Sequence, residues 1–144
     1  MCDKMKKYLI FTVASLLLMP SCLTKKEKPG ELTRTSGEVK LVTLDPGHFH
    51  AALVQKNSYK QVADEVYVYA PEGDDVQEHL NKINGYNTRT DSPTKWKEVV
   101  YLGSDFLEKM LSEKKGNVMI TAGNNGKKTE YIKQTLMAGI HVLA

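Results

Sequence analysis

The sequence predicts an α/β fold, a Rossmann-like parallel sheet of about five strands with helices on both faces. Short apolar runs alternate about five times with segments of helical periodicity, and the connections between them are short. The run over residues 117–123 is also uniformly apolar in its middle, as expected of a strand covered on both sides. Residues 38–144 contain all of these elements and suffice for one modest domain.

Each expected strand is an apolar run beside turn-forming residues. The first run stops at Asp-Pro-Gly, and EVYVYA is rich in β-branched and aromatic residues and is closed by Pro71 and Gly73. Three more such runs follow along the chain. We therefore expect strands over residues 39–44, 65–70, 97–103, 117–123 and 140–144.

The expected helices follow from apolar side chains at spacings of three and four. Val76, Leu80 and Ile83 have this spacing in DDVQEHLNKI, which begins with two aspartates. Ser104 is a suitable N-cap for the next helix, and Gly139 ends the last one because glycine tolerates positive φ. We expect helices over about 49–56, 74–83 and 129–138, one after Ser104 with Phe106, Leu107, Met110 and Leu111 on one face, burial of Tyr131, Ile132 and Leu136, and a polar loop over 85–93.

The first 21 residues have the pattern of a secretory signal peptide. Lys4, Lys6 and Lys7 precede an apolar run of about half the roughly 20 residues that span a bilayer. LLMPSC then resembles a bacterial lipobox, whose cysteine, here Cys22, is lipidated and becomes the mature N-terminus. We expect a lipid anchor, a flexible tether over residues 22–37 and a cell-envelope location, on the periplasmic or surface side of a bacterial membrane. The alternative is an ordinary secreted protein with a spare thiol.

The net charge excludes one class of partner. The chain has 20 basic and 17 acidic side chains, and residues 1–21 hold three of the lysines and one aspartate, which leaves 17 basic and 16 acidic side chains. A nearly neutral domain without clustered Lys and Arg lacks the electrostatic footprint of a nucleic-acid-binding protein. We therefore expect no nucleic-acid partner.

The segment LDPGHFHAAL, residues 44–53, has three interpretations. In the first, His48 and His50 are metal ligands, as in the His-x-His of amidohydrolase barrels. The chain is too short for such a barrel, and of its two further histidines we expect His79 on an exposed helix face and His141 in the last strand. In the second, Gly47 lets the backbone approach a dinucleotide pyrophosphate, with one glycine where G-x-G-x-x-G has three. In the third, the segment is a strand-to-helix turn without a ligand.

The C-terminal segment favours the second interpretation. GNVMITAGNNGKKTEYIKQTLMAGIHVLA, residues 116–144, resembles the second signature of the Gfo/Idh/MocA family of NAD(P)-dependent oxidoreductases: an apolar strand, a small-residue turn ending in Asn, a helix and Ala-Gly-x-His-Val-Leu. The resemblance covers about 39–144, where LDPGHFHAAL and YAPEGDDVQEHL are similar to a divergent bacterial branch. It implies a dinucleotide-binding domain over 38–144 without metal ligands, in which His141 is structural and not catalytic.

The resemblance also implies which residues face the cofactor. A carboxylate at Glu72 would repel a 2′-phosphate and no Arg follows it, so NAD is favoured over NADP. The alternative for Glu72 and for the two asparagines after the fourth strand is that they are plain turn residues. The implied contacts are Pro46, Gly47, His48 and Phe49 at the pyrophosphate, Ala70, Pro71 and Glu72 at the adenosine ribose, and Thr121, Ala122, Gly123, Asn124 and Asn125 at the nicotinamide ribose.

The family pattern continues past His-Val-Leu into an acidic residue, Lys and Pro, whereas this sequence stops at Ala144. The resemblance therefore implies the nucleotide-binding domain of an exported oxidoreductase that transfers a hydride to or from a sugar or sugar-like polyol. The catalytic lysine, the substrate domain and any homo-oligomer interface would be absent, so the chain alone would have no catalytic residue and no turnover. One alternative is a non-catalytic binding or structural lipoprotein of the same fold. Another is a metal-dependent hydrolase that uses the pair of His48 and His50.

Overall fold

The structure is a computed structural model that describes residues 36–144. The predicted signal peptide over 1–21, the predicted lipidation site Cys22 and the predicted tether up to residue 35 lie outside the described residues. The last two tether residues, Ser36 and Gly37, each donate a hydrogen bond of 3.1 Å to the carbonyl oxygen of Lys60. These two residues are thus bonded to the domain.

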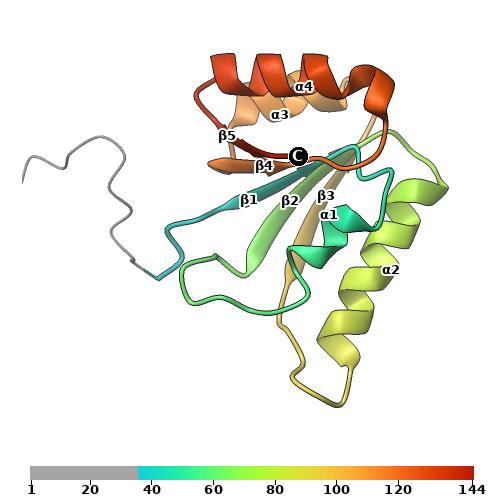
Figure 1. Cartoon of the computed structure of the whole chain (residues 1–144), viewed down its shortest axis with the longest axis vertical. Helices are drawn as coiled ribbons and strands as arrows, with labels where there is room; N and C mark the ends of the chain where they lie inside the picture. Colours follow the sequence, from blue (N-terminus) through green and yellow to red (C-terminus); the bar gives the residue numbers. More distant parts are fainter. Residues whose placement is uncertain (1–35) are drawn as a thin grey trace, which may run out of the picture. The chain divides into compact units, whose positions relative to one another are not determined.

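Five parallel strands form the sheet, in the order β3-β2-β1-β4-β5 (Figure 1). The central strand β1 (Leu41–Leu44) pairs with β2 (Glu65–Ala70) on one side and with β4 (Val118–Ile120) on the other. β3 (Lys97–Leu102) and β5 (His141–Leu143) form the two edges. The chain runs outward from β1 to β3 and then returns to place β4 beside β1. The strand order therefore reverses between β1 and β4, as in a doubly wound sheet.

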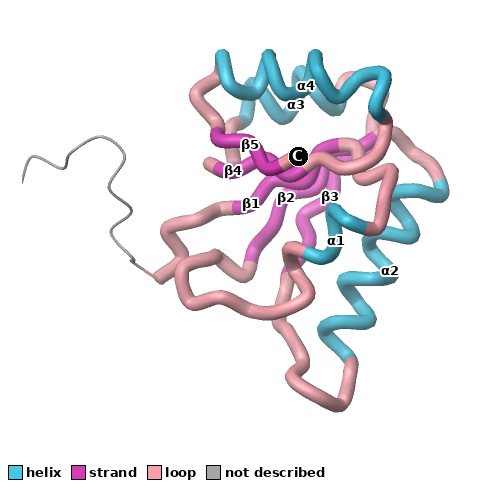
Figure 2. The backbone as a smooth tube through the Cα atoms, in the orientation of Figure 1, coloured by secondary structure: helices cyan, strands magenta, loops and turns pink. Residues whose placement is uncertain are grey.

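Helices cover both faces of the sheet (Figures 1 and 2). The single-turn helix α1 (His50–Leu53) and the long helix α2 (Asp74–Thr88) lie on one face, and α3 (Phe106–Glu113) and α4 (Asn125–Met137) lie on the other. The predicted fold class is confirmed. Within residues 36–144, no helix combines the length and the hydropathy that a membrane span requires.

The apolar strands are explained by burial on both faces. Alternate side chains of a strand point to opposite sides of its sheet. Val42 and Leu44 of β1 accordingly pack in the cluster that holds Phe106 and Met110 of α3, whereas Leu41 packs with the residues of α1 and α2. All four side chains of β1 are at most 3% exposed, so the sheet centre is a rigid base for the turns that follow its strands.

The first two helices differ from the sequence prediction in length. α1 ends at Leu53 and not near 56, because the carbonyl oxygen of Gln55 accepts the indole N–H of Trp96 at 2.6 Å and the Gln55 side chain is fully buried. α2 continues to Thr88, into the first four residues of the predicted loop over 85–93. Gly85 lies inside this helix, where a glycine costs about 1 kcal/mol of stability relative to alanine. The Asn87 side chain offsets this cost, because it forms hydrogen bonds with the Thr94 hydroxyl and with the backbone N–H and C=O of Trp96.

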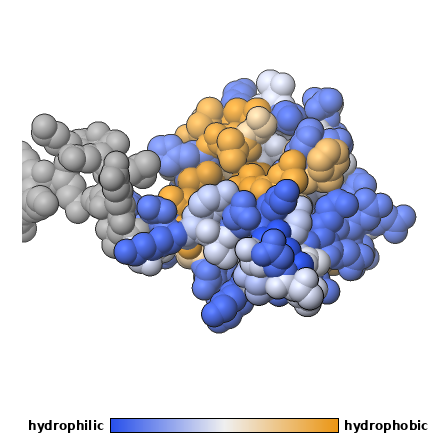
Figure 3. Space-filling model, turned by 60° about the horizontal axis from the view of Figure 1, so that its bottom comes forward, coloured by the Kyte–Doolittle hydropathy of each residue, from blue (hydrophilic) through white to orange (hydrophobic). Residues whose placement is uncertain are grey.

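The last two helices also depart from the prediction in detail. The N-cap of α3 is Asp105 and not Ser104, and the hydroxyl of Tyr101 donates to its carboxylate at 2.6 Å. α4 begins at Asn125, four residues earlier than expected. Its buried side chains are Tyr131 and Thr135, which lie one turn apart on the face toward the sheet. Leu136 therefore points away and is 56% exposed, so its predicted burial was wrong; Figure 3 shows apolar residues of this kind on the surface.

Candidate functional site

The turns after β1 and β4 meet at the carboxyl edge of the sheet, where the strand order reverses. Gly123 has φ +117°, and a Cβ atom built there would lie 2.6 Å from both the Cα and the carbonyl carbon of Gly47. The two turns thus pack backbone against backbone, as only a glycine at this position allows. In open α/β sheets, the crevice outside the carboxyl ends of the strands at such a reversal is where ligands bind.

A buried carboxylate joins the two turns. Asp45 follows β1 directly, has φ +45° and is 8% exposed. Its Oδ2 accepts the Tyr131 hydroxyl of α4 at 2.8 Å and the side-chain amide of Asn124 at 3.2 Å. Burial, reinforced by this hydrogen bond, raises the pKa of Tyr131, so the phenol stays a donor. Asp45 was not among the predicted site residues, although an acidic residue between a buried strand and Pro-Gly was the available signal.

The turn after β1 presents backbone donors. The amide of Gly47 is engaged, since it donates to the Asp45 carbonyl oxygen at 2.8 Å. Within residues 36–144, the amides of His48 and Phe49 donate to no protein acceptor. Neither do the amides of Asn125 and Gly126, the first two of α4, because a helix leaves its first N–H groups unpaired. Unpaired amides beside a close-packed turn are the usual ligands of phosphate groups. The turn can therefore hold an anion without a cationic side chain.

The first of two adjoining cavities lies between the turns after β1 and β2. It has a volume of about 70 Å³, and three residues predicted to face the ribose, Ala70, Pro71 and Glu72, line it together with Pro46. Its other polar lining residues are the carboxylates of Asp45, Asp74 and Asp75. No Lys, Arg or His side chain of the described residues lines this cavity. The structure thus brings two of the three predicted segments together around an acidic pocket.

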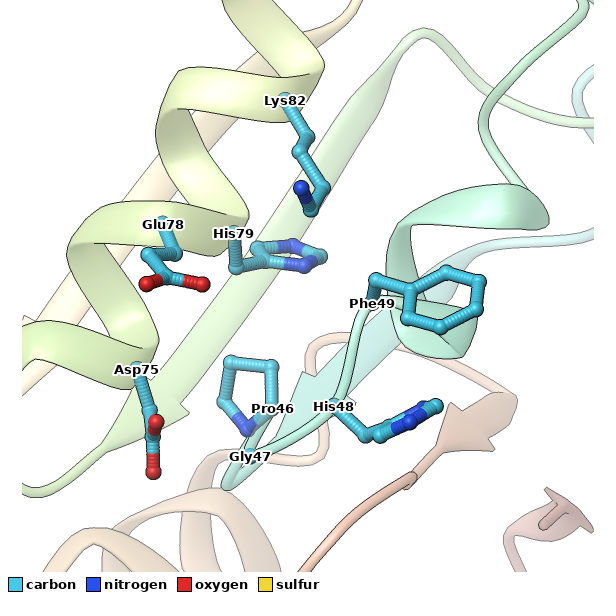
Figure 4. Close-up of a pocket in the computed structure, with 8 residues that line it drawn as sticks. All are labelled: Pro46, Gly47, His48, Phe49, Asp75, Glu78, His79 and Lys82. Carbon is cyan, nitrogen blue, oxygen red and sulfur yellow. The ribbon is translucent and has the colours of Figure 1, made fainter.

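The second cavity, of about 20 Å³, lies between the turn after β1 and helix α2 (Figure 4). Residues 46–49 form one side, and Asp75, Glu78, His79 and Lys82 form the other. The two cavities share Pro46 and Asp75. Each is below the roughly 300–1,000 Å³ of a typical small-molecule pocket, so a ligand of dinucleotide size would have to extend across both and over the crevice.

His79 is the site residue that sequence reasoning misplaced. It was expected on an exposed helix face, yet it is 3% exposed and its two ring nitrogens have no hydrogen-bond partner. Burial lowers its pKa to about 4, so the imidazole is neutral at physiological pH. Its ring lies between α2 and the Pro46 turn in Figure 4. The burial of His79 was visible in the helical periodicity, because Val76, His79 and Ile83, at spacings of three and four, are the three buried positions of α2.

The third predicted segment, residues 121–125, is only partly at the site. Gly123 and Asn124 contact the turn after β1 as described, and Thr121 is buried with its amide bonded to the Leu143 carbonyl oxygen. Ala122 packs with the core on the α1 side. Asn125 is exposed at the start of α4 and, like Asn124, lines neither cavity. The segment therefore supports the crevice more than it encloses a ligand.

The two histidines of the turn pack on each other and on Phe49. The ring centroids of His48 and His50 are 4.4 Å apart, and the His50 amide lies 3.4 Å from Nδ1 of His48. Within residues 36–144, no three His, Cys, Asp or Glu side chains are grouped so that they could hold a metal ion. The described part of the chain thus offers this pair without a third ligand.

Comparison with solved structures finds one informative relative. A crystal structure of a "putative oxidoreductase" from Parabacteroides merdae is 72% identical over 77% of this chain and superimposes with a TM-score of 0.76. The chain spans about a quarter of that protein's length, since the match covers 25% of it. No protein-family model matches the chain, and no curated protein is significantly similar to it.

Proposed function

We propose that residues 36–144 form the dinucleotide-binding domain of an NAD(P)-dependent oxidoreductase. The observation that carries this proposal is the close contact of Gly47 and Gly123 at the point of strand-order reversal, with unpaired amides on both turns. The name of the 72% identical solved protein supports the same class of reaction. Mass spectrometry of the natively purified chain tests it, because a bound dinucleotide adds a mass that denaturation releases.

The residues present fit such a cofactor. The amides of His48 and Phe49 would donate to the pyrophosphate oxygens, and the Glu72 carboxylate would accept the adenosine ribose hydroxyls in the acidic cavity. Asp45 holds the first turn against Asn124, which keeps the spacing of the two turns fixed. When bound, a nicotinamide dinucleotide supplies the carbon that accepts or releases a hydride. This chain's residues bind and orient it.

The acidic cavity favours NAD over NADP. Four carboxylates line it, and a 2′-phosphate placed there would meet like charge, which costs several kcal/mol when desolvated. Calorimetric titration of the full chain should show NAD binding at least about tenfold more tightly than NADP. Glu72→Gln should narrow this ratio, whereas Glu108→Gln on α3, across the sheet, should leave it unchanged. Tighter binding of NADP by the wild type would mean that the 2′-phosphate lies elsewhere.

The family and the substrate class belong to the proposal as well. The motif in residues 116–144 supports a Gfo/Idh/MocA-type enzyme that acts on a sugar or sugar-like polyol. Because the match covers only a quarter of the solved relative, we place the substrate pocket, any oligomer interface and the catalytic lysine outside residues 36–144. On this proposal, the described domain alone binds cofactor without turnover.

We also propose that Cys22 anchors the protein to a membrane of the cell envelope, on the strength of LLMPSC after a short apolar run. Replacing Cys22 with Ser should shift the protein from the membrane fraction into a soluble or unprocessed form, because a hydroxyl cannot carry the thioether-linked lipid. Fractionation and intact mass measure this. Unchanged partitioning, together with no lipid mass on the wild type, would contradict the anchor.

A further inference from the structure

Three consecutive aromatic side chains form an exposed cluster at the start of α1. The ring centroids of His48, Phe49 and His50 are 4.3–4.4 Å from one another, so each ring packs against the other two. The Phe49 ring is nevertheless 50% exposed, and both histidines are exposed. A grouped, exposed aromatic surface beside a ligand crevice indicates a contact that is not made within the domain.

None of the three aromatic residues lines the acidic cavity, whereas His48 and Phe49 line the second cavity that adjoins it. In Figure 4, the rings of His48 and Phe49 point to the side opposite Asp75 and Glu78 of α2. Glu72 lies at the end of β2, on one side of the β1 turn. A dinucleotide crosses the sheet at the point of strand reversal, with one nucleotide on each side. If the adenosine lies at Glu72, the half of the ligand beyond the turn is the one that carries the nicotinamide.

We propose that His48, Phe49 and His50 form a stacking surface for the nicotinamide ring. This inference rests on the proposed function and adds the ring's binding residues to it. A flat heteroaromatic ring stacks on an aromatic side chain through its π-face. The oxidised ring also carries positive charge, which the face of Phe49 attracts. The two imidazoles pack on Phe49 and restrict its rotamers, so little side-chain entropy remains to be lost on binding.

The test compares two ligands that differ only in the ring. NAD⁺ carries the nicotinamide, and ADP-ribose has the rest of the molecule without it. In titrations of the full chain, Phe49→Leu should weaken NAD⁺ binding about tenfold, within the range for one stacked base, and should change ADP-ribose binding less than about twofold. The ring of NADH is neutral, so Phe49→Leu should weaken NADH binding by a factor about two- to fivefold smaller than the factor for NAD⁺.

Two further variants make the comparison specific. Tyr59 lies away from the site and is 50% exposed, as Phe49 is. Tyr59→Leu therefore removes an equally exposed aromatic ring and should change the binding of neither ligand. Phe49→Tyr keeps a ring and should retain wild-type NAD⁺ affinity. Circular dichroism of each variant verifies that the fold is kept, as expected for changes of exposed side chains.

The outcomes separate this inference from the proposed function. If the wild type binds neither NAD⁺ nor ADP-ribose, the dinucleotide site itself is wrong and the stacking surface falls with it. If the wild type binds both and Phe49→Leu weakens both equally, the dinucleotide site stands and the stacking inference is overturned. Equal affinities of the wild type for the two ligands would overturn it as well, because the ring would then contribute nothing.

Discussion

Replacing Gly123 with alanine should lower the free energy of unfolding by about 2–5 kcal/mol, whereas Gly47→Ala, at the other side of the same contact, should change it by less than about 1 kcal/mol. At Gly123 the backbone has φ +117°, and the new Cβ would lie 2.6 Å from two backbone atoms of Gly47, which cannot rotate away. At Gly47 φ is not positive, and the nearest atoms to a new Cβ are 3.5 Å away, an ordinary contact distance.

Urea denaturation monitored by circular dichroism measures both variants. Any Gly123→Ala protein that still folds should also have lost dinucleotide affinity, because its two turns are forced apart at the crevice. Gly47→Ala is the control, because it adds a methyl group to the same pair of turns without a steric clash. If only Gly123→Ala loses stability and dinucleotide affinity, the loss comes from disrupting the contact between the two backbones. Similar stabilities for the two variants would contradict the backbone contact between Gly47 and Gly123.

The fold was predictable because it depends on local patterns. Runs such as EVYVYA predict strands, and their alternation with amphipathic helical segments predicts that the strands are parallel. The ends of α1 and α2 were not predictable, because they depend on hydrogen bonds between Gln55 or Asn87 and Trp96, which the fold brings together. Sequence patterns locate elements well and their termini poorly for this reason.

The site was predictable in part. The turns at Gly47 and Gly123 follow from strand ends, and the structure adds that Gly123 is the glycine without which they cannot meet. The position of Asp45 before Pro-Gly was a visible signal, but its hydrogen bond to Tyr131 was not, since that partner is 86 residues away in sequence. His79 was missed for a different reason: its polarity outweighed its place in the apolar stripe of α2, although the stripe was visible.

Two titratable groups, the half-buried Glu98 and the buried His79, should have opposite effects on stability as the pH changes. Burial raises the pKa of Glu98 to about 7, against a partial opposing effect of the Gln55 amide, which donates to its Oε1 at 2.5 Å. Its stabilising contribution is therefore complete below the unfolded pKa of 4.5 and is lost as the pH rises through 7. For His79, with a folded pKa of about 4, the contribution is complete above the unfolded value of 6.5 and is lost as the pH falls through 4.

The two contributions should nearly cancel in the wild type between pH 4.5 and 6.5, where each changes by about 1.4 kcal/mol per pH unit with opposite sign. Glu98→Gln mimics the protonated acid and removes its titration. Its free energy of unfolding should therefore rise by about 3 kcal/mol between pH 4 and 6.5, through His79 alone. His79→Leu removes two unpartnered buried nitrogens from the apolar stripe and should show the reverse, a fall of about 3 kcal/mol between pH 4.5 and 7.

The double variant, Glu98→Gln with His79→Leu, is the matched control for the two opposing pH effects. With both groups removed, the dependence of unfolding free energy on pH should return to that of the wild type, because the remaining titrating groups are the same in both proteins. Urea denaturation at half-unit steps from pH 4 to 7.5 measures all four proteins. If Glu98→Gln and the wild type had parallel curves, Glu98 would be ionised in the fold, and its buried Oε2, which has no partner among the described residues, would have to be solvated.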